Sequence, residues 1–202
     1  MQGSGGPIIS ASDLACRRGD RLLFRGLSLE LKGGEALHIT GANGTGKTTL
    51  IRALAGLAPP FAGLVHHIGA IGLLDERPAL DPELPLGKAM AFWQRVDGCT
   101  DPNGPLEALG LAPLLDVPMR YLSTGQRKRA GMAVLLNRAV PIWLLDEPLS
   151  GLDSAAIATV TALIQAHISG GGIALVASHQ PLDIEGLRTL AIEDYAPGED
   201  EQ

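Results

Sequence analysis

A short apolar run leads directly into a glycine-rich segment near residue 40. Residues 36–40 (Ala, Leu, His, Ile, Thr) have the pattern of a strand, and residues 41–48 read Gly-Ala-Asn-Gly-Thr-Gly-Lys-Thr. Residues 48–57 then carry the apolar spacing of a helix. Strand, loop and helix in this order are the context in which such a motif binds phosphate. The chain is therefore constrained to an α/β fold built around this loop.

The residue types of the loop indicate the chemistry of its ligand. Glycines allow backbone N–H groups to converge on anionic oxygens, and the following helix directs its positive end at them. Lys47 is expected to reach the β- and γ-phosphates, and the Thr48 hydroxyl to ligate magnesium. A glycine-rich turn without a ligand is the alternative. We predict nucleotide contacts from Gly41, Ala42, Asn43, Gly44, Thr45, Gly46, Lys47, Thr48 and Thr49.

Two adjacent acids follow a second apolar strand at residues 142–145. Asp146 ends this strand, where a carboxylate can face the phosphate site and hold magnesium through water. Glu147 is the expected general base, which orients and deprotonates the water that attacks the γ-phosphate. The alternative is a pair of solvated acids at a strand end. Together with the glycine loop, the two acids predict hydrolysis of ATP.

The rest of the chain alternates strands with helices. A helix is expected at residues 154–168 and a strand at 173–177, and this alternation predicts a parallel α/β sheet. Residues 27–31 alternate apolar and polar positions, and a Lys-Gly-Gly turn follows, which indicates an antiparallel edge sheet.

Prolines and glycines are dense in residues 77–118, where only short helices are expected, at 86–96 and 106–109. Ser123 is a natural N-cap for a helix that runs to about Arg138. We interpret residues 77–138 as a helical subdomain inserted into one nucleotide-binding domain that spans residues 1–202. Residues 197–202 are expected to be disordered.

Charge and hydropathy narrow the range of partners. The formal net charge is -6, which argues against nucleic acid or anionic lipid as the main partner. No apolar stretch approaches the roughly 18 residues of a membrane span, and the first ten residues lack a secretory signal. Cys16 and Cys99 are expected to be reduced thiols. We expect a cytoplasmic protein without direct membrane insertion, which reaches a membrane only through a partner.

The order of several motifs resembles the ATP-binding cassette ATPase family. After the glycine loop come Leu-Ser-Thr-Gly-Gln at 122–126, Leu-Leu-Asp-Glu-Pro at 144–148, Ser-Gly-Leu-Asp at 150–153, and His179. The resemblance implies that Ser123 and Gly125, with Gln126 beside them, contact ATP held by a second copy of the chain. It also implies that Asp153 acts in communication between subunits and that His179 is a catalytic switch near the γ-phosphate. Thr124 replaces the more usual glycine of the family.

Two family positions are filled differently here. The aromatic residue that stacks on adenine in many relatives falls near Arg18, whose guanidinium can also stack on a base; the alternative is an exposed, solvated arginine. The glutamine that helps to bind magnesium and water falls at Leu74, and Asp75 and Glu76 follow it. Either Asp75 or Glu76 substitutes for the glutamine, or the coupling to the membrane partner is altered.

Within the family, the chain most resembles the haem exporter ATPases of c-type cytochrome biogenesis. The resemblance lies in residues 22–28, 38–44, 171–172 and 178–182, and in Trp143. It implies a homodimer that is peripheral to the cytoplasmic face of the bacterial inner membrane and bound to an integral membrane permease subunit. The work done would be haem export or release of a haem-loaded chaperone. No haem site is expected in the chain itself, since His66 and His67 are adjacent on a strand and point to opposite faces.

Three other functions remain as alternatives at this point. The chain could serve a transporter of another small substrate, or act on nucleic acid as soluble cassette ATPases do, although it has no basic surface for that role. The loss of glutamine at Leu74 would also suit an assembly module that binds ATP and hydrolyses it slowly.

Overall fold

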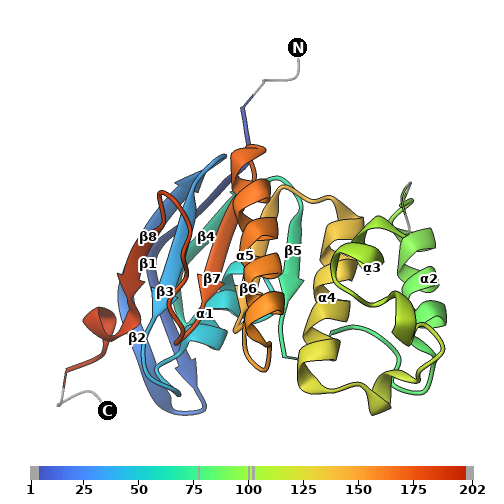
Figure 1. Ribbon diagram of the computed structural model, residues 1–202. Coiled ribbons are helices and arrows are strands. Elements are labelled where there is room, and N and C mark those ends of the chain that lie inside the picture. The colour runs from blue at the N-terminus through green and yellow to red at the C-terminus, as the bar shows by residue number, and fades with distance from the viewer. Residues whose placement is uncertain (1–4, 77, 100, 102, 199–202) are drawn as a thin grey trace.

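The computed structural model describes residues 5–198 except residues 77, 100 and 102. Its strands form two sheets, and its helices lie between the sheets, on the outer face of one sheet, and in a separate group at one side (Figure 1). This architecture confirms the expected α/β class with an antiparallel edge sheet and a helical subdomain.

The antiparallel sheet has the strand order β2-β1-β4. Its strands are β1 (Ile8–Arg18), β2 (Arg21–Lys32) and β4 (Ala62–Ile68). The sequence pattern at residues 27–31 captured only the second half of β2 and missed β1 and β4. Register shifts interrupt β1 between Ala11 and Leu14 and again before Arg17, so this strand has no continuous alternation to recognise.

The parallel sheet has the order β5-β6-β7-β3-β8, and every neighbouring pair in it is parallel. Its strands are β3 (Ala36–Thr40), β5 (Ile71–Leu74), β6 (Ile142–Asp146), β7 (Ile173–Ala177) and β8 (Arg188–Ala191). Every residue of β6 and β7 is buried, which explains their continuous apolar runs. The carboxyl ends of β3, β6 and β7 therefore meet along one edge, where the glycine loop, the acid pair and His179 follow them.

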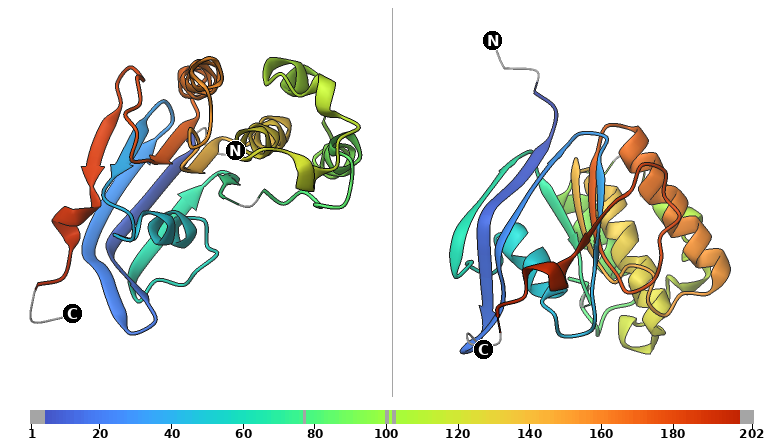
Figure 2. Two further views of the ribbon diagram at one scale, coloured as in Figure 1. Left: turned by 60° about the horizontal axis from the view of Figure 1, so that its bottom comes forward. Right: turned by 90° about the vertical axis from the view of Figure 1, so that its left-hand side faces the viewer.

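Helix α1 (Lys47–Leu54) lies between the two sheets, and α5 (Ser154–Ser169) covers the opposite face of the parallel sheet (Figure 2). The expected extension of α1 to residue 57 is wrong, because Gly56 adopts a φ of 71° and ends the helix with a left-handed residue. On the face covered by α5, the ring of Trp143 stacks on His167 with centroids 3.8 Å apart.

The helical subdomain contains α2 (Leu86–Val96), α3 (Gly104–Ala108) and α4 (Thr124–Arg138), with short 3-10 turns at Ala112–Leu114 and Met119–Tyr121. Helices α2 and α4 match the expected ranges. Helix α3 begins two residues before the expected position because Pro105 is accommodated in its first turn.

The chain ends with β8 and a 3-10 turn at Ile192–Tyr195. Pro197, at the start of the segment expected to be disordered, is buried, and residues 199–202 lie outside the described residues. Within the described part of the chain, no helix is both long and apolar enough to cross a membrane.

Candidate functional site

The glycine loop joins β3 to α1 in a backbone conformation that most side chains would prevent. Gly41 and Gly46 have φ values of 149° and 113°, and a Cβ on Gly41 would lie 2.7 Å from the Ile192 side chain. Gly46 is the N-cap of α1 and supplies no capping side chain. The first N–H groups of α1 are therefore left for a ligand, and the helix dipole favours an anion there.

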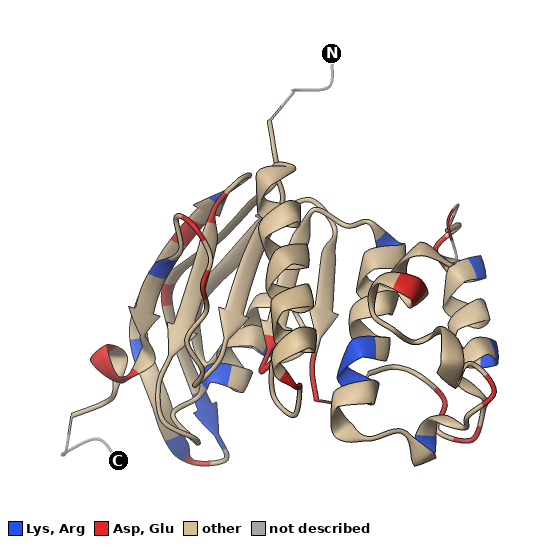
Figure 3. Ribbon diagram, viewed as in Figure 1, with Lys and Arg blue, Asp and Glu red and all other residues tan. Residues whose placement is uncertain are grey.

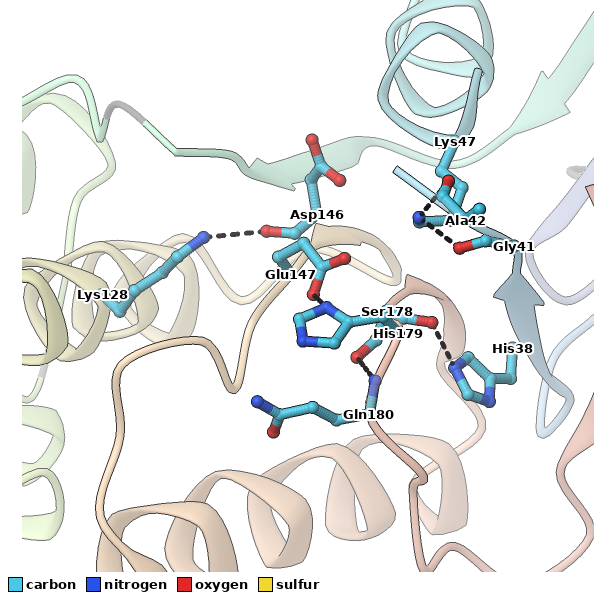
Figure 4. Close-up of polar contacts among 10 residues, drawn as sticks. All are labelled: His38, Gly41, Ala42, Lys47, Lys128, Asp146, Glu147, Ser178, His179 and Gln180. Atoms are coloured by element: carbon cyan, nitrogen blue, oxygen red, sulfur yellow. Dashed lines mark hydrogen bonds and ion pairs between the residues drawn. The ribbon is translucent and has the colours of Figure 1, made fainter. Parts of the chain in front are cut away.

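Lys47 is only 6% exposed, although it carries a charge. Its ammonium donates hydrogen bonds to the carbonyl oxygens of Gly41, at 2.7 Å, and Ala42, at 3.1 Å (Figure 4). The Thr45 hydroxyl donates to the same Ala42 carbonyl at 2.9 Å. The loop thus holds one positive charge inside its curve, where phosphate oxygens would offer stronger acceptors than the two carbonyls.

Asp146 ends β6 in a site suited to a cation. It is 1% exposed, and its Oδ1 atom has no hydrogen-bond partner in the described structure. Burial raises the pKa of Asp146, whereas hydrogen bonding by the Thr48 side chain opposes this rise. An unpaired buried carboxylate oxygen beside a threonine hydroxyl matches the oxygen ligands that magnesium prefers. Among the described residues, no group of three or more His, Cys, Asp or Glu side chains is arranged to hold a metal alone.

Glu147 and His179 contact each other beside the glycine loop. The Oε2 atom of Glu147 lies 2.9 Å from Nδ1 of His179, and the two side chains come from the ends of β6 and β7 (Figure 4). Glu147 has a φ of 48°, a left-handed value that is uncommon for residues other than glycine. Such backbone strain is typical of sites where side-chain direction matters more than local stability.

Three polar cavities that share Glu76 meet at this edge of the described structure. The largest, of about 630 Å³, is lined by Arg18, Thr48, Thr49, Arg52, Ala58, Asp75, Glu76 and Asp146. The two smaller ones lie beside the glycine loop. One, of about 300 Å³, is lined by Arg18, Leu23, Asn43, Gly44, Gly46, Lys47, Thr48, Thr49, Glu76 and Glu147. The other, of about 360 Å³, is lined by Asn43, Glu76, Thr124, Arg127, Lys128, Glu147, Ser150 and His179. The structure thus brings Arg18 and Thr49 to a cavity that the phosphate loop also lines. A larger apolar cavity lies in the helical subdomain and includes none of the loop residues.

The two acids after β5 have different surroundings. The carboxylate of Asp75 lies 3.6 Å from the guanidinium of Arg52 on α1. Glu76 lines all three cavities and shares the two smaller ones with Glu147, whereas Asp75 lines only the one that includes Thr48 and Asp146. Leu74, where the sequence analysis expected the family glutamine to fall, is 2% exposed and packs in the core beside Gly131 of α4. Figure 3 shows these acidic positions after β5 next to the acidic end of β6.

The Leu-Ser-Thr-Gly-Gln segment begins α4. The Ser123 hydroxyl accepts the Gln126 N–H at 3.2 Å, and the Gln126 side chain accepts the Ser123 N–H at 2.8 Å, which forms a capping box. A Cβ on Gly125 would lie 2.4 Å from the carbonyl oxygen of Gly151, so only glycine fits there. Asp153 caps α5 by accepting the Ala156 N–H at 2.8 Å.

Three contacts near the site carried no signal in the sequence. The Lys128 ammonium donates to the Asp146 carbonyl at 2.8 Å, and a Glu193 carboxylate oxygen accepts the Ala42 N–H at 2.5 Å. His38 lies 3.1 Å from the Ser178 carbonyl through its Nε2 atom. Each contact joins segments that are distant along the chain, so neither motif nor periodicity could have revealed it.

Comparison with known proteins agrees with this geometry. A family model described as ABC transporter matches residues 24–150. The cytochrome c biogenesis ATP-binding export protein CcmA of Novosphingobium aromaticivorans is 56% identical over 93% of this chain and 96% of its own length. The protein of the same name from Zymomonas mobilis is 47% identical over 95% of this chain and 87% of its own.

A solved ATP-binding subunit of an ABC transporter superposes with a TM-score of 0.76. It shares 21% sequence identity and covers 85% of this chain and 79% of its own, so this likeness supports the fold alone. The family match spans the phosphate loop, the α4 start and the acid pair, and the two curated relatives extend the likeness over nearly the whole chain. The chain therefore belongs to the ABC transporter family and is one of its ATP-binding subunits.

Proposed function

We propose that this chain is the ATP-hydrolysing subunit of an ABC exporter that serves c-type cytochrome biogenesis. The process is inferred from the two relatives named above, which are described as export proteins of cytochrome c biogenesis. Their likeness extends over more than nine-tenths of this chain. The observation that carries the enzymatic part is the meeting of Lys47, Asp146 and Glu147 at one sheet edge, around neighbouring cavities large enough for phosphate groups.

Thr48 and Asp146 are the residues proposed to hold magnesium with the nucleotide. Bound magnesium would supply positive charge that neutralises the charge developing on the phosphate oxygens. The unpaired Oδ1 of Asp146 supports this role, because a buried carboxylate oxygen without a partner is costly. Lys47 would leave the loop carbonyls and bind the β- and γ-phosphates.

Glu147 is the proposed general base. Its carboxylate would accept a proton from water as the water oxygen bonds to the γ-phosphorus and the bond to the bridging β-phosphate oxygen breaks, which leaves ADP and phosphate. His179 would orient Glu147 through the 2.9 Å contact between them. Arg18 lines the same cavity and is proposed to stack on the adenine.

Glu76, rather than Asp75, is proposed to take the place of the family glutamine. Asp75 lies 3.6 Å from Arg52 and borders only the cavity that includes Thr48 and Asp146, whereas Glu76 borders all three cavities and shares two of them with Glu147. A carboxylate at this position would contact the hydrated cation and the attacking water through its oxygens, as an amide oxygen does in relatives.

A second copy of the chain is proposed to complete each ATP site. Helix α4 is 15 residues long, and its N-cap, Ser123, is exposed. The helix dipole favours an anion at this end. Ser123, Gly125 and Gln126 would meet the γ-phosphate held by the partner's loop. The dimer would bind an integral membrane permease at the cytoplasmic face of the bacterial inner membrane and power haem export or release of a haem-loaded chaperone.

The substitution Glu147→Gln tests the proposal directly. ATP turnover should fall by about 10²- to 10⁴-fold, the usual contribution of a general base, while ATP-dependent dimers accumulate. Phosphate release and sedimentation of the purified chain with ATP and magnesium measure both effects. Glu107→Gln, at an exposed position of α3, is the matched control and should behave as wild type. Unchanged hydrolysis in the Glu147 variant would refute the assigned base.

A slow-hydrolysing assembly module is the second candidate function, and the burial of Leu74 where relatives carry glutamine favours it. Comparing the rate of phosphate release with the rate of ATP dissociation from the wild-type dimer separates the two. Dissociation faster than hydrolysis would favour the assembly role, and hydrolysis that outpaces dissociation would favour the motor role.

A further inference from the structure

A buried lysine next to the acid pair has no part in the chemistry described so far. Lys128 lies on α4 and is 6% exposed, and its ammonium donates a 2.8 Å hydrogen bond to the Asp146 carbonyl oxygen (Figure 4). Burial lowers the pKa of Lys128, whereas the carboxylates of Asp146, Glu76, Glu147 and Asp75 oppose that shift. Taking an ammonium out of water is costly unless its hydrogen bonds are satisfied, so this position requires a structural or functional reason.

The bond from Lys128 fixes one end of the peptide that joins Asp146 to Glu147. The other end of this peptide is fixed as well, because the Glu147 N–H donates to the Ala177 carbonyl on β7 at 2.7 Å. Both polar groups of one peptide unit are thus held by two different elements, α4 on one side and β7 on the other. Rotation of this peptide would break at least one of the two bonds.

The fixed peptide precedes the strained residue of the site. Glu147 has a φ of 48°, and a non-glycine residue keeps such a value only where its surroundings enforce it. In this conformation the Glu147 carboxylate reaches Nδ1 of His179 at 2.9 Å. A return of Glu147 to an ordinary backbone conformation would redirect its side chain away from His179 and from the cavity that they share.

We propose that Lys128 is a positioning residue for hydrolysis. Its ammonium holds the Asp146 carbonyl so that Glu147 keeps the left-handed conformation that aims its carboxylate at the γ-phosphate side of the cavity. Lys128 lies five residues after Ser123, the N-cap of the same helix. Its bond to Asp146 therefore also links the start of α4, which is proposed to meet the partner's ATP, to Glu147, the general base of the chain's own site. This inference rests on the proposed ATPase function and adds a residue to that site.

The test compares Lys128→Met with Lys128→Arg in the full chain. Methionine keeps the apolar stem and removes the donor, whereas arginine keeps a donor and the charge. We expect Lys128→Met to lower kcat by about 10- to 100-fold, the usual loss for a misplaced catalytic group, with KM for ATP unchanged within about twofold. Lys128→Arg should recover most of kcat. Lys88→Met on α2, an exposed lysine of the same subdomain, is the control and should keep wild-type turnover.

A second measurement separates positioning from general stability. In a Glu147→Gln background, where the base is already removed, Lys128→Met should leave ATP binding and ATP-dependent dimers unchanged. Loss of either one, or equal loss of kcat in the Met and Arg variants, would overturn the proposal. Should Lys128→Met aggregate, Lys128→Gln takes its place; its side chain is one atom too short for this bond, so the same loss of kcat is required.

The wild-type chain keeps this test distinct from the proposed function. Wild-type protein that neither binds nor hydrolyses ATP would refute the ATPase function itself. Wild-type hydrolysis together with full activity of the Lys128→Met variant would refute only the positioning role.

Discussion

The two helix starts that carry the family motifs are built in opposite ways. Helix α1 begins at Gly46, which offers no capping side chain, and its first N–H groups are open toward a polar cavity. Helix α4 begins at Ser123, where a capping box already satisfies two backbone N–H groups within the chain. The first start leaves its donors to an anionic ligand, whereas the second already pairs two of its N–H groups within the chain.

This difference agrees with the proposed ATP site, in which one copy holds the nucleotide at its α1 start and the other copy contacts it with its α4 start. A loop that binds phosphate in its own chain gains from leaving donors unpaired, because the ligand satisfies them. A helix start that meets ATP only when two chains associate must remain stable while it is alone. The capping box of α4 supplies this stability, and the remaining positive dipole end stays available to the partner's phosphate.

The largest effect is expected from Lys47→Ala at the α1 start. Removal of the ammonium would leave the loop without the charge that binds the β- and γ-phosphates, so turnover should fall by about 10²- to 10³-fold. ATP binding by the isolated chain should weaken as well, which titration with a fluorescent nucleotide would measure. Wild-type affinity in this variant would contradict the contrast between the two helix starts, because ATP binding at the α1 start would then not depend on Lys47.

An intermediate effect is expected at the α4 start, where Ser123→Ala removes the capping acceptor. The free energy of unfolding should fall by about 1 kcal/mol, as for other lost N-caps, and ATP-dependent dimers should be lost while monomer ATP affinity stays. Urea unfolding and sedimentation measure the two effects. Ser123→Asn keeps a good cap but places a larger group at the partner's phosphate, so it should restore stability without restoring dimers. Equal recovery of both properties by Asn would mean that the cap alone explains the need for serine.

The same contrast explains which parts could be predicted from sequence. The glycine loop and the Ser123 cap are local motifs whose geometry depends on a few adjacent residues, so β3, α1 and α4 were located closely, apart from the last turn of α1. The antiparallel strand β1 was missed because its register shifts hide the alternation. Strand β8 is short and only partly buried at the sheet edge, so it has no apolar run to mark it.

The contacts that hold the site residues in place, such as those of Lys128 and Glu193, could not be predicted from sequence patterns. Lys128 resembles any charged residue of an exposed helix face, and only the packing of α4 against β5, at the edge of the parallel sheet, makes it buried. Glu193 meets Ala42 from 151 positions away, across the sheet edge formed by β8 and β3. Motifs therefore identify the groups that act on a ligand, whereas the groups that hold them depend on the whole fold.

The smallest effect is expected from a change of Glu193, which accepts the Ala42 N–H of the phosphate loop, just before the α1 start, at 2.5 Å. Glu193→Gln keeps an oxygen acceptor for this N–H and removes one negative charge beside the loop that receives phosphates. ATP should therefore bind about two- to threefold more tightly at low salt, and the gain should shrink at high salt because the charge is exposed to solvent. Glu185→Gln, an exposed acid on the loop after β7, is the matched control and should change nothing. Weaker binding by the Glu193 variant at every salt concentration would instead mean that the carboxylate holds the loop open, and that the α1 start, like the α4 start, needs a side-chain acceptor to keep its shape.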